Sequence, residues 1–237
     1  MTAFGYTGIT MSQDLIAYYI CSFLSFVPAI VLHEVSHGFA AYKLGDPTAK
    51  RAGRLTLNPI AHIDTFGTII LPLLMMLANG PVFGYAKPVP YNPTYFKNKR
   101  VGDFLVGMAG PAANLVMALL GAAVSWLLYP HALHAVAGSD LFYYFYAVFL
   151  PLFSLINLFL MFFNLLPIPP LDGSSIFALF IPKGKMMSYY RIQRYAMPVL
   201  LVLLFLVPYA LNVNPIGIYL RFTAGNVANF MFPYPIY

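Results

Sequence analysis

The stretch from Leu15 to Tyr42 reads LIAYYICSFLSFVPAIVLHEVSHGFAAY, which is long and apolar enough to cross a lipid bilayer as one helix. Its single acidic residue is Glu34, and no other glutamate occurs in the chain of 237 residues. A carboxylate inside hydrocarbon is costly and therefore indicates a functional group. The stretch predicts a membrane-spanning helix that carries a chemically active site.

Two histidines enclose this glutamate in the motif His33-Glu34-Val35-Ser36-His37. On a helix, a spacing of four residues places both imidazoles on one face. The carboxylate beside the first imidazole can then reach a water molecule held by a metal ion that the two histidines share. The motif predicts that His33 and His37 bind zinc and that Glu34 is the general base.

The composition indicates an integral membrane protein. Hydrophobic residues make up 60% of the chain, charged residues 8%, and the mean hydropathy is +0.75. Spans of about twenty residues each leave little chain for a separate soluble domain. We therefore expect an all-α polytopic membrane protein forming one domain over residues 1–237, with a catalytic core at about 15–175 and C-terminal helices at about 186–232.

Further apolar runs predict a bundle of about four to six transmembrane helices. The long runs cover residues 101–129, 141–166 and 195–211. Residues 65–78 are short for a span and fit a re-entrant segment near the active site, and whether this run and residues 214–232 cross the membrane stays open. The net charge of +6 comes from Lys and Arg in short loops, which favours topology signals over nucleic-acid binding. The tendency of basic loops to face the cytoplasm puts the histidine motif near that side.

A catalytic zinc site needs a third protein ligand besides two histidines and a water molecule. Among the six aspartates, Asp172 stands out because it follows an apolar run in N-L-L-P-I-P-P-L-D-G, residues 164–173. Three prolines unwind the helix there, and Gly173 permits a close turn that could aim the carboxylate at the histidines. The alternative is that Asp172-Gly173 is an ordinary surface turn. Asn164 is a candidate donor for an oxyanion, or else a packing contact between helices.

Together the H-E-V-S-H motif, the G-P-A-A-N sequence at Gly110 to Asn114, and the run ending at Asp172-Gly173 resemble the site-2 protease family of intramembrane zinc metalloproteases. The resemblance implies that His33, His37 and Asp172 hold one zinc ion per chain and that Glu34 is the general base. The chain resembles the compact bacterial members of the family, which have no PDZ-like insertion and no CBS pair. We therefore expect a multi-pass protein of a bacterial cell membrane. The implied activity is cleavage of peptide bonds in or near transmembrane segments.

The bilayer is one expected partner, and a membrane-protein substrate is the other. A substrate helix must unwind before its peptide bond can be attacked, and the enzyme must then replace the lost hydrogen bonds. The stretch from Val82 to Pro90 has prolines and strand-forming residues, so we expect it to be extended and to pair with the substrate as an added strand. A zinc-binding transporter or scaffold without proteolytic activity is the alternative, although metal binding alone would not need Glu34. The sequence leaves the natural substrate and the oligomeric state open.

Overall fold

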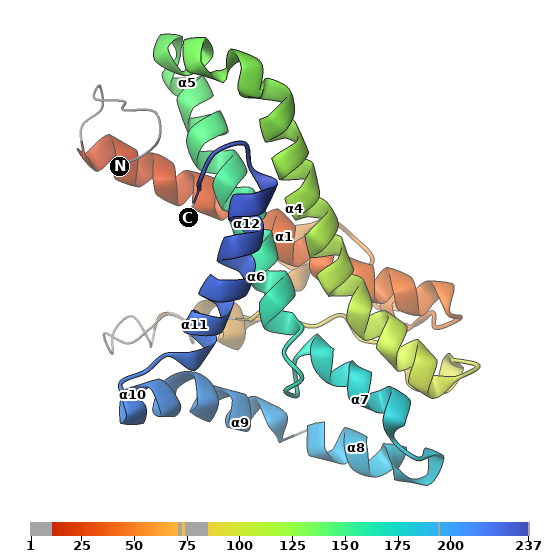
Figure 1. Ribbon diagram of the computed structural model, residues 1–237. Coiled ribbons are helices and arrows are strands. Elements are labelled where there is room, and N and C mark those ends of the chain that lie inside the picture. The colour runs from red at the N-terminus through yellow and green to blue at the C-terminus, as the bar shows by residue number, and fades with distance from the viewer. Residues whose placement is uncertain (1–10, 71–72, 74–84, 194, 237) are drawn as a thin grey trace. The chain divides into compact units, whose positions relative to one another are not determined.

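A computed structural model describes residues 11–70, 73, 85–193 and 195–236 of the chain (Figure 1). Within these residues all regular elements are helical and no strand occurs, which confirms the expected all-α class. The α-helices are α1 (Met11–Lys43), α2 (Thr48–Arg51), α4 (Lys99–Gly138), α5 (Asp140–Tyr143), α6 (Leu150–Asn164), α7 (Ser175–Phe180), α8 (Met186–Gln193), α9 (Ala196–Leu201), α10 (Val207–Leu211), α11 (Pro215–Leu220) and α12 (Asn226–Met231).

Three helices in the described part of the chain are long and apolar enough to cross a membrane: Asp14–Lys43, Lys99–Ala132 and Asp140–Asn164. A fourth span results if Ala196–Leu211 and Pro215–Met231 are counted together. This is the lower end of the expected four to six. Of the predicted re-entrant run, Thr65–Ile70 is a π-helical turn, whereas residues 71, 72 and 74–78 lie outside the described residues, so its path is untested.

The chain forms two compact units, each assembled from separated stretches. The first unit contains residues 1–29, 112–163 and 217–237, and the second contains residues 30–111 and 164–216. All the predicted zinc ligands, Glu34, Asn164 and the described part of the predicted extended segment belong to the second unit. The expected single domain over the whole chain stays a prediction.

In the first unit, Asn114 joins three helices through hydrogen bonds. Its side-chain amide donates to the main-chain carbonyl of Ala29 in α1 at 3.2 Å and to the side-chain carbonyl of Asn157 in α6 at 2.8 Å. Both asparagines are completely buried. In an apolar surrounding such pairs hold helices together, so Asn114 of the G-P-A-A-N sequence has a structural role here.

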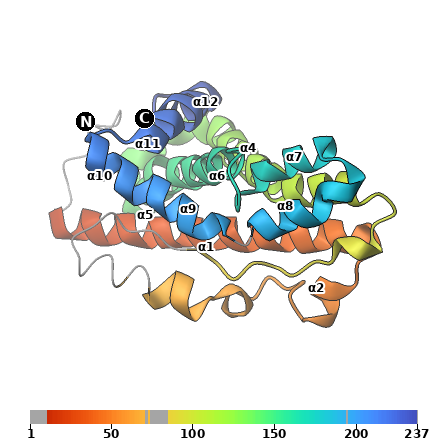
Figure 2. The ribbon, with the colours of Figure 1, turned by 90° about the horizontal axis from the view of Figure 1, so that it is seen from below.

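In the second unit, the extended stretch that follows residue 84 runs beside the C-terminal half of α1 (Figure 2). Residues 85–92 contain no helix, as expected for this part of the predicted segment. Buried Asp46, just beyond the end of α1, accepts hydrogen bonds from the main-chain N–H of Asn92 and from that of Thr48. Buried Asp103 in α4 accepts a bond from the Tyr91 hydroxyl at 2.7 Å. The segment is therefore tied to α4 and to the turn that follows α1.

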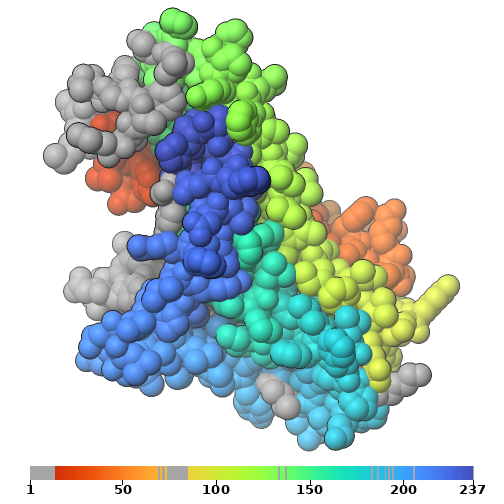
Figure 3. Space-filling view, in the orientation of Figure 1, coloured from red at the N-terminus to blue at the C-terminus, as the bar shows by residue number. Residues whose placement is uncertain are grey.

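Apolar side chains remain exposed on many helices, as expected for surfaces that face lipid rather than water. Phe23 in α1 is 66% exposed and Leu127 in α4 is 76% exposed. The helices α9 and α10 lie open on the face seen in the space-filling view, and Tyr209 there is 84% exposed (Figure 3). These exposed residues agree with the composition in assigning the chain to a membrane.

Candidate metal centre

Helix α1 places the two histidines of the motif one turn apart and facing each other. The Nε2 atoms of His33 and His37 are 3.0 Å apart, and their rings meet edge to face. Both side chains are buried. The i, i+4 spacing therefore has the effect expected from the sequence, because both imidazoles present a nitrogen to the same point in space.

Asp172, in the second stretch of the same unit, reaches the same point. Its Oδ2 atom lies 3.1 Å from His33 Nε2 and 3.4 Å from His37 Nε2. A surface turn would leave this carboxylate in solvent, whereas Oδ2 is buried. The three residues form the one group of possible metal ligands found among the described residues.

The turn before Asp172 explains how the carboxylate is aimed. Successive main-chain hydrogen bonds close the chain between Leu166 and Ser174, and Asp172 begins a short 3-10 turn. A Cβ atom at Gly173 would collide with the carbonyl of Leu165, so only glycine allows this close backbone approach. The Tyr189 hydroxyl donates to the carbonyl of Ser174 at 2.9 Å. Burial raises the pKa of Tyr189 above its usual value.

The spacing of the three ligand atoms fits zinc. A tetrahedral zinc ion at about 2.0–2.1 Å from each donor holds its ligand atoms about 3.3 Å apart. The observed separations between His33, His37 and Asp172 are 3.0, 3.1 and 3.4 Å. Two imidazoles and a carboxylate are also the donor types that zinc accepts in catalytic sites.

The hydrogen bond on the far side of His37 supports the same conclusion. His37 Nδ1 lies 2.6 Å from the main-chain carbonyl of Val106, which can only accept, so Nδ1 carries the proton. In the neutral ring, the lone pair of Nε2 then points at the other two ligand atoms. Such a bond to a backbone carbonyl is typical of metal-binding histidines. The lone pairs of His33, His37 and Asp172 would repel one another unless a cation were bound between them.

Helix α4 comes close to the histidines because residue 110 has no side chain. A Cβ atom at Gly110 would collide with His37 Nε2 and with His33 Cε1. The glycine of the G-P-A-A-N sequence thus leaves the space that the ligand atoms need.

We expect Gly110→Ala to displace the two imidazoles and to lower zinc affinity by at least ten-fold, since supporting contacts of metal ligands typically contribute 10- to 100-fold. Gly138→Ala is the matched control, because Gly138 ends the same helix and an added Cβ there meets nothing within 4 Å. Zinc titration of the purified proteins measures both. Equal affinities for the two variants would contradict this account of Gly110.

Glu34 is held beside the ligand group by the extended segment. Its Oε2 atom accepts a hydrogen bond of 2.9 Å from the main-chain N–H of Val89. Glu34 itself is not one of the three clustered ligand residues. This position, next to a possible metal ion and outside its ligand set, suits a general base.

The main-chain groups on one edge of the extended segment form hydrogen bonds within the chain. Tyr85 donates its N–H to Gly67 O and accepts from Thr68 Oγ1. Lys87 donates its N–H to His62 O and accepts from Arg54 Nη2. Val89 donates its N–H to Glu34 Oε2. Since successive residues of an extended chain point to opposite sides, the groups of residues 86, 88 and 90 face the other way.

Asn164 and the three remaining histidines of the chain do not belong to this group of possible ligands. Asn164 ends α6 and is half-buried, and its role as an oxyanion donor stays a prediction. His62 is buried, with Nε2 at 2.9 Å from the carbonyl of Thr56. His131 and His134 are exposed residues of α4 in the first unit.

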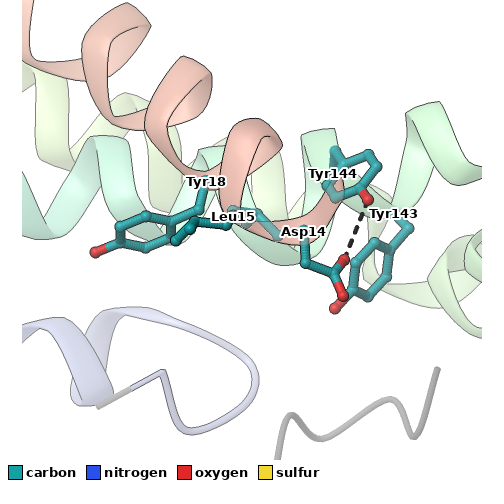
Figure 4. A pocket seen from close by; sticks show the side chains of 6 residues that line it. Asp14, Leu15, Tyr18, Tyr143 and Tyr144 are labelled. Carbon is teal, nitrogen blue, oxygen red and sulfur yellow. Dashed lines mark hydrogen bonds between the residues drawn. The ribbon is translucent and has the colours of Figure 1, made fainter. Parts of the chain in front are cut away.

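The first unit has a hollow of its own near the start of α1 (Figure 4). Its lining is mainly tyrosine and aliphatic, and the Tyr144 hydroxyl in it donates to Asp14 at 3.1 Å. The lining residues are Asp14, Leu15, Tyr18, Tyr143, Tyr144 and Val148. None of the predicted site residues lines it, so we assign it no part in the chemistry.

Comparisons with known proteins agree with this geometry. The model of Peptidase family M50 matches residues 133–207, a range that includes Asp172. "Putative zinc metalloprotease YwhC" of Bacillus subtilis (strain 168) is 37% identical over 216 residues, which are 87% of this chain and 89% of that protein. "Putative zinc metalloprotease Rip2" of Mycolicibacterium smegmatis is 35% identical over 145 residues, 61% of this chain and 51% of that protein. The protein of the same name from Mycobacterium tuberculosis (strain H37Rv) is 32% identical over 180 residues, 76% and 64% of the two chains. No solved structure matches the chain.

Proposed function

The chain belongs to peptidase family M50, and from that premise we propose that it is a zinc endopeptidase that hydrolyses peptide bonds in or near the transmembrane segments of membrane proteins. The observation that carries the proposal is the convergence of His33, His37 and Asp172, with Glu34 beside them. Two imidazoles and a carboxylate make the metal site, and the fourth residue adds a base that metal binding alone would not require.

Each residue has a distinct task in the proposed reaction. A zinc ion bound by His33, His37 and Asp172 supplies Lewis acidity, which polarises the scissile carbonyl and lowers the pKa of water toward 7. Glu34 accepts a proton from the attacking water as the new C–O bond forms, and it delivers that proton to the leaving amine as the C–N bond breaks. Asn164 is the proposed donor to the oxyanion, because an amide can stabilise negative charge without adding charge of its own.

The proposed location of the reaction is within the membrane, near its cytoplasmic face. His33 is 18 residues beyond Leu15 in α1, which corresponds to roughly 27 Å of a hydrocarbon layer about 30 Å thick. The basic residues that follow α1 and precede α4 favour a cytoplasmic position for those loops. Both features support a site a short distance below that surface.

The direct test uses the purified full-length protein in lipid vesicles with a single transmembrane helix as substrate. We expect cleavage within or next to the helix, loss of cleavage after zinc is removed with a chelator, and recovery when zinc is returned, because no other described residues offer an alternative metal site. A protein that binds zinc but cleaves neither this substrate nor a soluble peptide would favour the transporter or scaffold instead.

The extended segment is the proposed binding surface for the unwound substrate. Because the edge formed by Tyr85, Lys87 and Val89 is engaged, a substrate would pair with the edge formed by residues 86, 88 and 90. Proline has no N–H, so that edge offers three carbonyl acceptors and a single donor, the N–H of Ala86. Residues 82–84 of the expected segment from Val82 to Pro90 lie outside the described residues.

We expect Ala86→Pro to raise KM about three- to ten-fold, the effect of one main-chain hydrogen bond of about 1 kcal/mol, with little change in kcat or zinc content. Ala86→Gly retains the N–H and is the comparison variant. Initial rates over a range of substrate concentrations in vesicles separate KM from kcat. If both variants bind substrate like the parent protein, pairing along this edge is wrong.

A further inference from the structure

The sequence next to Glu34 in space is Lys87-Pro88-Val89-Pro90, in which a proline stands on each side of Val89 and has no main-chain donor. Of the three residues from Pro88 to Pro90, only Val89 has an N–H group, and this group donates to Glu34 Oε2 at 2.9 Å. The flanking rings also restrict the backbone on both sides of the donor. The segment thus presents one fixed N–H to the single glutamate of the chain.

Packing holds Val89 close to the zinc-binding helix. Its side chain is buried and lies against Gly38, the residue that follows His37. A Cβ atom at Gly38 would lie 2.7 Å from Val89 Cγ1, so a larger residue there would push the segment away from α1. Two positions earlier, Lys87 is anchored by its N–H to His62 O at 2.9 Å and by its C=O to Arg54 at 2.6 Å.

These contacts determine how the Glu34 carboxylate is oriented. A glutamate side chain rotates freely unless a partner holds it, and a base displaced by about 1 Å can lose roughly 100-fold in rate. With Oε2 held by Val89, Oε1 is the oxygen left for the water that must be deprotonated. We propose that Val89 is a positioning residue, whose main-chain N–H fixes the Glu34 carboxylate for proton transfer. This inference rests on the proposed proteolytic function.

The test replaces one N–H by oxygen and observes Glu34 directly. Cell-free synthesis with glutamate labelled by carbon-13 at its carboxylate gives one carboxylate resonance, because Glu34 is the only glutamate. Incorporation of the hydroxy-acid analogue of valine at position 89 removes the donor and keeps the side chain. The matched control is the corresponding ester at Lys87, which removes a hydrogen bond of the same 2.9 Å length to His62 O and none to Glu34. Zinc content, kcat and KM for a transmembrane substrate in vesicles are measured for all three proteins.

We expect the Val89 ester to move the Glu34 resonance and to lower kcat roughly ten- to hundred-fold, with KM and zinc content retained. The Lys87 ester should leave the resonance in place. The inference is overturned if the resonance does not move, if it moves equally in both esters, or if it moves and kcat stays unchanged. A parent protein that binds zinc and cleaves nothing overturns the proposed function instead, whatever the resonance does.

Discussion

Glu34→Gln is expected to lower peptide hydrolysis by about 10²- to 10⁴-fold, the usual contribution of a general base, while zinc content stays the same. Glutamine has nearly the same shape as glutamate and can still accept the hydrogen bond from the Val89 N–H through its carbonyl oxygen. It cannot take a proton from water. The substitution therefore removes the proposed base and leaves the proposed ligands His33, His37 and Asp172 intact.

The experiment measures zinc by elemental analysis and cleavage of the transmembrane substrate on the same preparation. Asp14→Asn provides the control, since it neutralises the other carboxylate of α1 in an exposed position at the start of the helix. Undiminished cleavage by Glu34→Gln would exclude this base. Joint loss of zinc and cleavage would instead mean that Glu34 supports the metal site, and the division of roles proposed here would be wrong.

The sequence was enough to name the three proposed ligand residues because each of them follows from a local pattern. The spacing of His33 and His37 requires only a helix, and Asp172 stood out because it follows an apolar run that ends in three prolines and is itself followed by Gly173. The structure brings the three together, as expected. The all-α class was also predictable, because apolar runs long enough to span a bilayer are helical unless they close into a barrel.

The supporting contacts could not be predicted, because they depend on main-chain groups or on a missing side chain. The carbonyl of Val106 fixes His37, and the N–H of Val89 holds Glu34, but every residue except proline offers these same groups. Gly110 was noticed only as part of G-P-A-A-N, and its closeness to the histidines requires the packing of α4 on α1. The sequence signal that could have found Val89 is its position between two prolines.

Asp172→Asn is expected to lower zinc affinity by about 10²- to 10³-fold and to abolish cleavage with it. Zinc binding in structural sites with four ligands is worth about 10–16 kcal/mol, so one charged ligand accounts for roughly 3–4 kcal/mol. The amide occupies the same volume but has lost the negative charge that Oδ2 directs at His33 Nε2 and His37 Nε2. Affinity is measured by competition with a fluorescent chelator, and activity with the transmembrane substrate.

Asp140→Asn is the control for this loss of charge, because Asp140 is an exposed residue at the start of α5 in the first unit. Excess zinc separates the two possible reasons for lost activity. If zinc restores cleavage by Asp172→Asn, the carboxylate acts by holding the metal, as the distances to both histidines suggest. If the variant binds zinc as tightly as the parent protein, Asp172 is not a ligand. The short distances from its carboxylate to His33 and His37 would then need another explanation. Glu34→Gln and Asp172→Asn should therefore both lower cleavage, but only Asp172→Asn should also lower the zinc content.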